Sequence, residues 1–269
     1  MKIAVLGYGP AGLIAAKTLY DEGHTDLDII GAGGKSVIGG AQYLHEPILN
    51  PHQEPEGEIT FVKIGEREGY ADKVYNDNDV ATSWDHYEGV VPAWALGPTY
   101  DVLWEHFVDG LIQDTLNGLS LSMLAETDKY DLVFNSIPAH CLCLHPGSHT
   151  FPKASISLVP YSPVHMSNVV VYSGRKEDQW YRTSNIFGEA WSEFGSVLAE
   201  GAEYPDGMID PGGVEVLPIQ RGFKPLGTDC DCHPDVVRIG RFGLWDRKIL
   251  LHHVPAQVRA ALDKRTVSA

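Results

Sequence analysis

The feature that most constrains this chain is a glycine-rich turn close to its first residue. In the stretch KIAVLGYGPAGLIAA (residues 2–16), Gly7, Gly9 and Gly12 follow a short apolar run and precede an alanine-rich segment. This arrangement predicts a strand, a tight turn and a helix over residues 11–22. The first glycine makes the turn, the second leaves room for a pyrophosphate, and the third lets the helix pack on the strand.

The start of that helix predicts a bound dinucleotide. Its free backbone N–H groups face a phosphate, with Pro10 and Ala11 in the first turn. Dinucleotide folds usually also have an acidic residue, about 20 residues further on, that binds the ribose. Here the second predicted strand, 27–30, is followed by glycines and Lys35 instead. Lys35 either contacts a phosphate, which keeps NADP open, or is a surface lysine.

Composition excludes several classes of partner. The chain has 269 residues, 43% of them hydrophobic, so one large or two interleaved domains are expected. Its 36 acidic residues against 20 lysines and arginines argue against binding of bulk duplex nucleic acid. A local basic groove and a solvated surface are both open for Arg175, Lys176, Arg182, Arg221 and Lys224. No apolar run approaches the roughly 20 residues of a membrane helix, and none resembles a signal peptide, so we expect a cytoplasmic protein without membrane contact.

A second glycine segment changes the balance between cofactors. Residues 37–46, VIGGAQYLHE, place Gly39, Gly40, Ala41 and Gln42 shortly after the second predicted strand. Small residues at such a place let the backbone approach a planar ring closely. The segment resembles the second glycine motif of the flavin amine oxidase and UDP-galactopyranose mutase group, which passes beside the flavin. A flexible loop is the alternative interpretation.

Two later segments extend this resemblance. Residues 131–135 predict a buried strand, which in this group returns the chain to the flavin domain. Near the C-terminus, RIGRFGLWDRKILLHHVPAQV predicts a strand, a break at Gly240 and Arg241, and a closing helix over 244–261. In the group, a strand, a GR pair and a helix close the FAD site. The resemblance therefore implies that Gly240, Arg241 and Trp245 contact FAD, although a buried structural arginine is the alternative for Arg241.

The resemblance implies an α/β fold with a discontinuous Rossmann-like FAD-binding domain and an inserted mixed β-sheet substrate domain. The FAD domain is expected to comprise residues 1–54, 126–146 and 226–269, and the substrate or lid domain residues 55–125 and 147–225. Within the inserted parts, residues 58–65 and 72–77 predict short strands, 99–116 a helix, and 167–194 further strands.

The implied activity is that of an FAD-dependent oxidoreductase acting on a small or conjugated amine, with hydride passing to the flavin. Small flavoproteins of this sort also occur in phage genomes, so a nucleotide-linked substrate is one setting. Two alternatives stay open: mutase-like isomerisation of a sugar nucleotide, and a non-catalytic nucleotide- or metal-binding module. The sequence leaves the oligomeric state open.

Catalytic residues are harder to predict, because a flavin performs the electron transfer and the protein supplies position and one base. His45, beside the second glycine segment, is a candidate base or hydrogen-bond donor. Tyr181 and Arg182 are candidate substrate contacts, since aromatic and arginine side chains suit a sheet that faces a flavin. A structural histidine and ordinary cross-strand pairs are the alternatives.

The four cysteines form two Cys-x-Cys pairs, Cys141 with Cys143 and Cys230 with Cys232. Four thiols on two loops could close a tetrahedral zinc site, or a mixed site could include His149 or His233. Buried thiols without a metal are the alternative in a reducing compartment.

Overall fold

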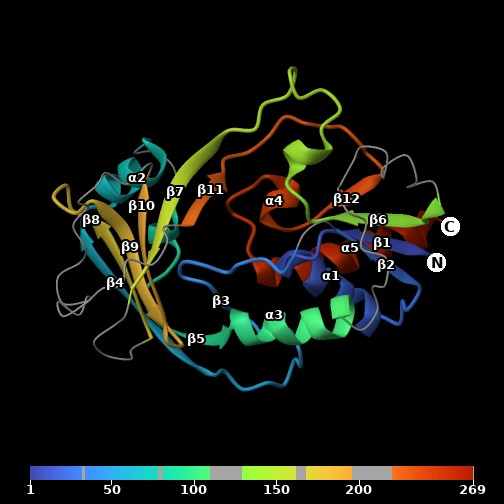
Figure 1. Cartoon of the computed structure of the whole chain (residues 1–269), viewed down its shortest axis with the longest axis horizontal. Coiled ribbons are helices and arrows are strands. Elements are labelled where there is room, and N and C mark those ends of the chain that lie inside the picture. Colours follow the sequence, from blue (N-terminus) through green and yellow to red (C-terminus); the bar gives the residue numbers. More distant parts are fainter. Residues whose placement is uncertain (32–33, 78–80, 110–128, 162–167, 196–219, 269) are drawn as a thin grey trace.

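The computed structural model describes residues 1–31, 34–77, 81–109, 129–161, 168–195 and 220–268. These residues form two sheets that lie side by side along the molecule (Figure 1). One sheet has four strands in the order β12-β6-β1-β2. The other has eight strands in the order β11-β7-β10-β9-β8-β4-β5-β3.

The four-stranded sheet is assembled from three distant stretches of the chain. β1 (Ile3–Leu6) lies between β2 (Leu27–Ile30) and β6 (Leu132–Asn135), and β12 (Val236–Arg238) lies beside β6. All three pairings are parallel, and β1 and β6 are buried at every position, as expected when both faces of a parallel sheet are covered. The discontinuous Rossmann-like part of the predicted fold is confirmed.

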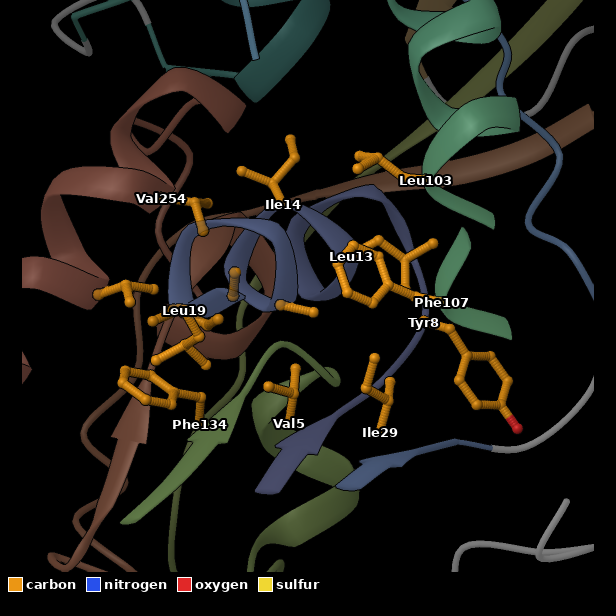
Figure 2. Packing of buried hydrophobic residues seen from close by; sticks show 14 of the residues in the cluster. Val5, Tyr8, Leu13, Ile14, Leu19, Ile29, Leu103, Phe107, Phe134 and Val254 are labelled. Carbon is orange, nitrogen blue, oxygen red and sulfur yellow. The ribbon is translucent and has the colours of Figure 1, made fainter. Parts of the chain in front are cut away.

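The main core lies around α1 (Pro10–Asp21). Figure 2 shows Leu13, Ile14 and Leu19 of this helix above the strand residues Val5, Ile29 and Phe134. α3 (Leu96–Trp104), which continues as a π-helical turn over Glu105–Asp109, and α5 (Val254–Ser268) complete this core. α3 therefore packs on α1, although its residues fall in the stretch expected for the substrate domain; the predicted domain limits stay a prediction.

The eight-stranded sheet is mixed. Its strands are β3 (Tyr43–Leu44), β4 (Gly57–Gly65), β5 (Gly89–Ala95), β7 (Lys153–Pro160), β8 (Val169–Gly174), β9 (Trp180–Ile186), β10 (Glu189–Gly195) and β11 (Gln220–Pro225). Neighbouring strands are antiparallel except β4 and β8. α2 (Arg67–Tyr75) lies so close to this sheet that a Cβ on Gly69 would be 2.0 Å from the carbonyl oxygen of Gly174. The inserted mixed sheet of the predicted fold is confirmed.

Short helical turns connect these parts: η1 (Ser83–Asp85), η4 (Ala139–Leu142), α4 (Gly240–Leu244) and η5 (Leu251–His253). No helix in the described part of the chain is both long and apolar enough to cross a bilayer.

Three local predictions differ from the structure. Residues 72–75 form the last turn of α2 rather than a strand, and Asn76 is the left-handed C-cap of the helix. The buried Tyr70, Ala71 and Val74 have helical spacing that a six-residue window hides. The closing helix begins at Val254, since Trp245 adopts a left-handed φ of 56° and ends α4. The helix predicted over 99–116 begins at Leu96, and its part beyond residue 109 lies outside the described residues.

Candidate functional site

The carboxyl edge of the parallel sheet is closed by the predicted glycine turn. Gly7 has a φ of +96°, and a Cβ on Gly12 would lie 1.9 Å from the carbonyl oxygen of Gly7. Gly9 differs, because among the described residues a Cβ there would meet only Ser36 Oγ, at 3.8 Å. Gly7 and Gly12 are therefore needed to fold the turn, whereas the space at Gly9 is open to a ligand.

The first turn of α1 is suited to an anion. Gly9 is its N-cap and forms no side-chain cap, and Pro10 occupies the first turn. The backbone N–H groups at this end and the helix dipole favour a negative charge. Gly240 of α4 packs against the same turn, since a Cβ on it would lie 2.7 Å from Cβ of Ala11. The first glycine segment and the GR segment thus meet, as the resemblance implies.

Two tyrosines fix the loop that follows β2. The Tyr8 hydroxyl donates to the carbonyl oxygen of Gly31, and the Tyr100 hydroxyl of α3 donates to the carbonyl oxygen of Tyr8 at 2.8 Å. Lys35 forms an ion pair with Asp101 of α3. Because the charge of Lys35 is already paired, its predicted contact with a cofactor phosphate stays a prediction.

Glu193 of β10 holds the second glycine segment. Its Oε1 accepts a hydrogen bond from the backbone N–H of Ala41 at 3.1 Å, and Gly40, with φ +84°, lies against the same carboxylate. Oε1 also accepts from Nε of Arg182 at 2.7 Å, and Oε2 accepts from the Tyr181 hydroxyl at 2.7 Å. Glu193 therefore joins Ala41, Tyr181 and Arg182, three of the predicted site residues, through one side chain.

The strand register places this contact in a row across five strands. Arg182 lies opposite Tyr172 on one side and Glu193 on the other, and the row continues through Leu158 to Gln220.

Residues 39–41 cross this row: a Cβ on Gly39 would meet Gln220, Trp191 and Leu158. Gln42, also predicted to contact the cofactor, is exposed. The second glycine segment thus lies on the face of the mixed sheet that presents Arg182 and Glu193.

Charged side chains at this face are buried, which shifts their pKa values. Burial alone would raise the pKa of Glu193, but Arg182, Lys224 and the hydrogen bonds from Arg182 and Tyr181 lower it, so Glu193 is ionised. Burial lowers the pKa of Lys224 to about 7, and Arg182 adds to this effect. The Lys224 ammonium lies 4.4 Å from the centre of the Tyr181 ring. Of the five basic residues considered from the sequence, Arg182 and Lys224 thus lie at this face, whereas Arg175, Lys176 and Arg221 are exposed.

Two arginines near α4 add positive charge. Burial and the charge of Arg182 lower the pKa of Arg241, whose Nε donates to the carbonyl oxygen of Ile249 at 3.2 Å. Arg247 lies over the ring of Tyr75, 4.7 Å from its centre. Trp245 is 1% exposed and donates its indole N–H to the carbonyl oxygen of Pro152 at 2.9 Å. Its predicted cofactor contact stays a prediction, and its observed contacts are structural.

His45 follows β3 and lies in a group of aromatic rings. Its ring stacks on Tyr87 with centres 5.1 Å apart, and Tyr43 and His252 lie at 4.6 Å and 5.0 Å. Burial, with His252 and His253 nearby, lowers the pKa of His45 to about 4. His45 is therefore neutral near pH 7, the state that a general base requires.

The two cysteine loops lie side by side, but the residues that cluster between them are not the four cysteines. Cys143, Cys230 and Cys232 form one buried cluster, and the fourth potential ligand is His149. Cys141 is exposed, with Sγ 3.5 Å from Nε2 of the adjacent His140. The structure therefore does not bring all four thiols together. It brings together three thiols and His149, which is the mixed alternative considered from the sequence.

Glu193 is the central residue that sequence analysis did not select. The signal was present in the hairpin β9–β10, whose two-residue turn contains Phe187 and Gly188 with φ values of 51° and 86°. A two-residue turn there aligns Arg182 with Glu193 and forms an opposite-charge pair. Lys224 could not be distinguished from a surface lysine, because its burial depends on the pairing of β11 with β7.

Comparison with known proteins defines the class of fold. No protein-family model and none of the curated proteins matches the sequence. Solved structures share the arrangement of a Rossmann-type α/β domain with an inserted mixed sheet, the fold that the motifs imply.

Two of these structures illustrate the likeness. A reduced UDP-galactopyranose mutase superposes with a TM-score of 0.58 at 12% identity, over 100% of this chain and 96% of that one. A tryptophan 6-halogenase from Streptomyces toxytricini superposes with a TM-score of 0.53 at 10% identity, over 96% of this chain and 71% of that one. The mutase belongs to the group that the glycine segments resemble, so the resemblance is confirmed at the level of the fold.

Proposed function

We propose that this protein is an FAD-dependent enzyme. The observation that supports it best is the placement of the three glycine segments. Gly240 packs on the first turn of α1, at the carboxyl edge of the parallel sheet, and residues 39–41 cross the row of the mixed sheet that presents Arg182 and Glu193. Ligands of open α/β sheets bind at this edge. Lys35, the residue that keeps NADP open, is paired with Asp101, whereas the second glycine segment and the GR segment favour FAD.

The residues fit such a cofactor. The uncapped backbone N–H groups at Gly9 and Ala11 would hold the pyrophosphate, while Pro10, which has no N–H, sets the first turn of α1. The small residues of 39–41 would allow the flavin ring to lie against the backbone. Bound FAD supplies two-electron chemistry. The chain itself supplies binding and charge: Glu193 fixes the 39–41 segment through Ala41 and keeps Arg182 oriented.

The charge at the mixed sheet favours an anionic, nucleotide-linked substrate. Four basic side chains are close enough there to influence one another's pKa values or to contact the same tyrosines: Arg182, Lys224, Arg241 and Arg247. The single negative charge of Glu193 balances only one of these positive charges. A sugar nucleotide presents two phosphates that arginine can bind in a bidentate manner. We therefore place mutase-like isomerisation of a sugar nucleotide first among the candidate reactions.

Amine oxidation, the activity implied by the sequence motifs, is the second candidate. Its structural support is the stack of aromatic rings formed by Phe61, Tyr87 and Tyr172, with centres 5.1 Å and 6.1 Å apart. Such rings can bind a protonated amine through their faces. The neighbouring arginine side chains oppose that charge, which is why an amine substrate ranks second.

The first test is the visible absorbance spectrum of the purified protein, with the released cofactor identified by mass. We expect flavin bands and FAD. Gly9→Val should fold yet release FAD, because its side chain fills the space proposed for the pyrophosphate, whereas a Cβ there meets only Ser36 Oγ, at 3.8 Å, among the described residues. Gly97→Ala, where a Cβ meets nothing within 4 Å, is the matched control and should stay loaded. A fully loaded Gly9→Val variant would contradict the proposal.

The second test separates the candidate reactions. A UDP-sugar should bind, and its affinity should fall about tenfold as pH rises through about 7, because Lys224 loses its proton. Lys224→Met should remove this dependence, while the exposed Lys176→Met should not. Sugar-nucleotide isomerisation without net redox change supports the mutase, and reduction of the flavin by an amine supports the oxidase. FAD that responds to neither substrate nor reductant indicates a non-catalytic module.

A further inference from the structure

Three thiols and one imidazole converge outside the proposed cofactor and substrate residues. Cys143, His149, Cys230 and Cys232 each offer one ligand atom, and these four atoms all lie within 4.8 Å of one another. Nδ1 of His149 is 3.3 Å from Sγ of Cys143 and 3.6 Å from Sγ of Cys232. Ligands 2.3 Å from a tetrahedral zinc ion are about 3.8 Å apart, so the observed spacing is close to that of a metal site.

The four residues come from two loops that the topology brings side by side. The first loop, 136–152, leads from β6 to β7, and the second, 226–235, leads from β11 back to β12. β6 lies beside β12 in one sheet, and β7 lies beside β11 in the other. Both loops therefore cross between the sheets on the same side of the molecule (Figure 1). A metal between them would hold together the loop that leads into the mixed sheet and the loop that returns to the parallel sheet.

Neighbouring groups support the ligands in the manner of an outer shell. Nε2 of His149 faces Oδ1 of Asp231 at 3.5 Å, which leaves Nδ1 directed at the sulfurs. Arg238 donates to the carbonyl oxygens of Cys230 and Cys232 at 2.7 Å and 2.8 Å and lies 3.5 Å from Sγ of Cys230. Three thiolates and one Zn²⁺ have a net charge of about −1, which this guanidinium offsets.

Hydrogen bonds between the loops hold them in register around the cluster. The backbone N–H of Thr150 donates to Asp229 at 2.7 Å, and the Thr228 hydroxyl donates to the carbonyl oxygen of Thr150 at 2.8 Å. The backbone N–H of Leu226 donates to the carbonyl oxygen of Pro152 at 2.9 Å. The ligand geometry is thus fixed by contacts other than those of the ligands themselves.

We propose that Cys143, His149, Cys230 and Cys232 bind a structural zinc ion that fastens together the two connections between the sheets. A closed set of four nitrogen and sulfur ligands suits Zn²⁺ and leaves no open position for catalysis. Zinc binding goes beyond the proposed flavin chemistry and does not depend on it.

The test is metal content measured by mass spectrometry on protein purified under reducing conditions without chelator. We expect one zinc per chain. His149→Ala and Cys143→Ser should lose it, and Cys141→Ser, which alters an exposed thiol outside the cluster, should keep it. This pair of outcomes also separates the Cys₃His site from a site made of all four thiols, which would lose zinc on Cys141→Ser and keep it on His149→Ala.

A second measurement avoids ligand variants that fail to fold. Metal-stripped wild-type protein is titrated with Co²⁺, and the expected product shows the visible bands of tetrahedral cobalt with thiolate ligands, which zinc then displaces. Wild-type protein that binds neither metal, iron in place of zinc, or a disulfide between these cysteines in reduced preparations would overturn the proposal. Metal content does not depend on flavin content, and the cobalt bands are read as the difference from the metal-free protein with the same flavin content. Failure here therefore leaves the proposed function untouched.

Discussion

The parallel sheet buries almost only apolar side chains, whereas the mixed sheet buries a group of polar and charged ones. In the first, Ile3, Val5 and Phe134 are 0% exposed, and the carboxyl edge is closed by the backbone of the glycine turn. In the second, Ser192 and Glu193 are also 0% exposed, and one face presents the side chains of Arg182 and Glu193. The proposed cofactor region is thus built from backbone shape, and the proposed substrate region from paired charges.

This difference predicts two kinds of sensitivity. A site made of backbone tolerates changes of side-chain charge but not added volume at its glycines. A site made of buried charges tolerates little change of charge, because each ion depends on its partner. Substitutions in the two regions should therefore fail for different reasons, and the three predictions that follow test that contrast.

The largest effect is expected at Gly12. A Val side chain there begins with a Cβ 1.9 Å from the carbonyl oxygen of Gly7, so the turn and α1 cannot keep their packing. We expect a loss of more than about 4 kcal/mol in the free energy of unfolding, or no folded protein. Thermal and denaturant unfolding followed by circular dichroism measure it, with Gly97→Ala as control. A Gly12→Val variant of normal stability would contradict the close approach of α1 to the backbone of Gly7.

A smaller but still large effect is expected at Glu193. Glu193→Gln leaves Arg182 buried without its counter-charge, and we expect the free energy of unfolding to fall by about 3 kcal/mol. Glu22→Gln is the control, because it removes an exposed ion pair with Arg259 and should cost less than about 0.5 kcal/mol. Equal effects from the two variants would mean that the buried charges of the mixed sheet are no more critical than surface ones.

The smallest effect is expected at His45, which follows β3 of the mixed sheet and packs against His252 of η5. Its folded pKa of about 4 lies below the value of 6.5 for a free histidine, so the unfolded chain binds the proton first as pH falls. Stability should therefore be unaffected at neutral pH and decrease as pH drops from about 6.5 towards 4. After allowance for solvent screening, this histidine should account for about 1 to 2 kcal/mol.

Denaturant unfolding at neutral pH and at about pH 4.5 tests this sign. His45→Gln should lose less stability than the wild type between the two conditions, and His24→Gln, in the loop before β2, is the control. A steeper acid loss in His45→Gln than in the wild type would contradict a buried neutral histidine.

Much of the fold could be predicted because its signals are local. The strand at 27–30, the helix that follows Gly9 and the strand within 131–135 depend on contiguous patterns, and the structure has them within a residue or so. Residues 72–77 show where such signals fail, since the short apolar pair Val74 and Tyr75 suits a strand, while the buried residues of the longer segment have helical spacing. The late start of α5 depends on the left-handed Trp245, which no local pattern announces.

The class of fold and the glycine turn could be predicted from local patterns, because glycines at fixed spacing admit few conformations. The sequence also shows two Cys-x-Cys pairs, but not that His149 rather than Cys141 lies beside the other thiols. That arrangement, the burial of Lys224 and the contacts of Glu193 depend on the tertiary fold, since they require particular strands to pair in a particular register. Local steric rules act along the chain, whereas burial and charge pairing arise only when distant segments meet.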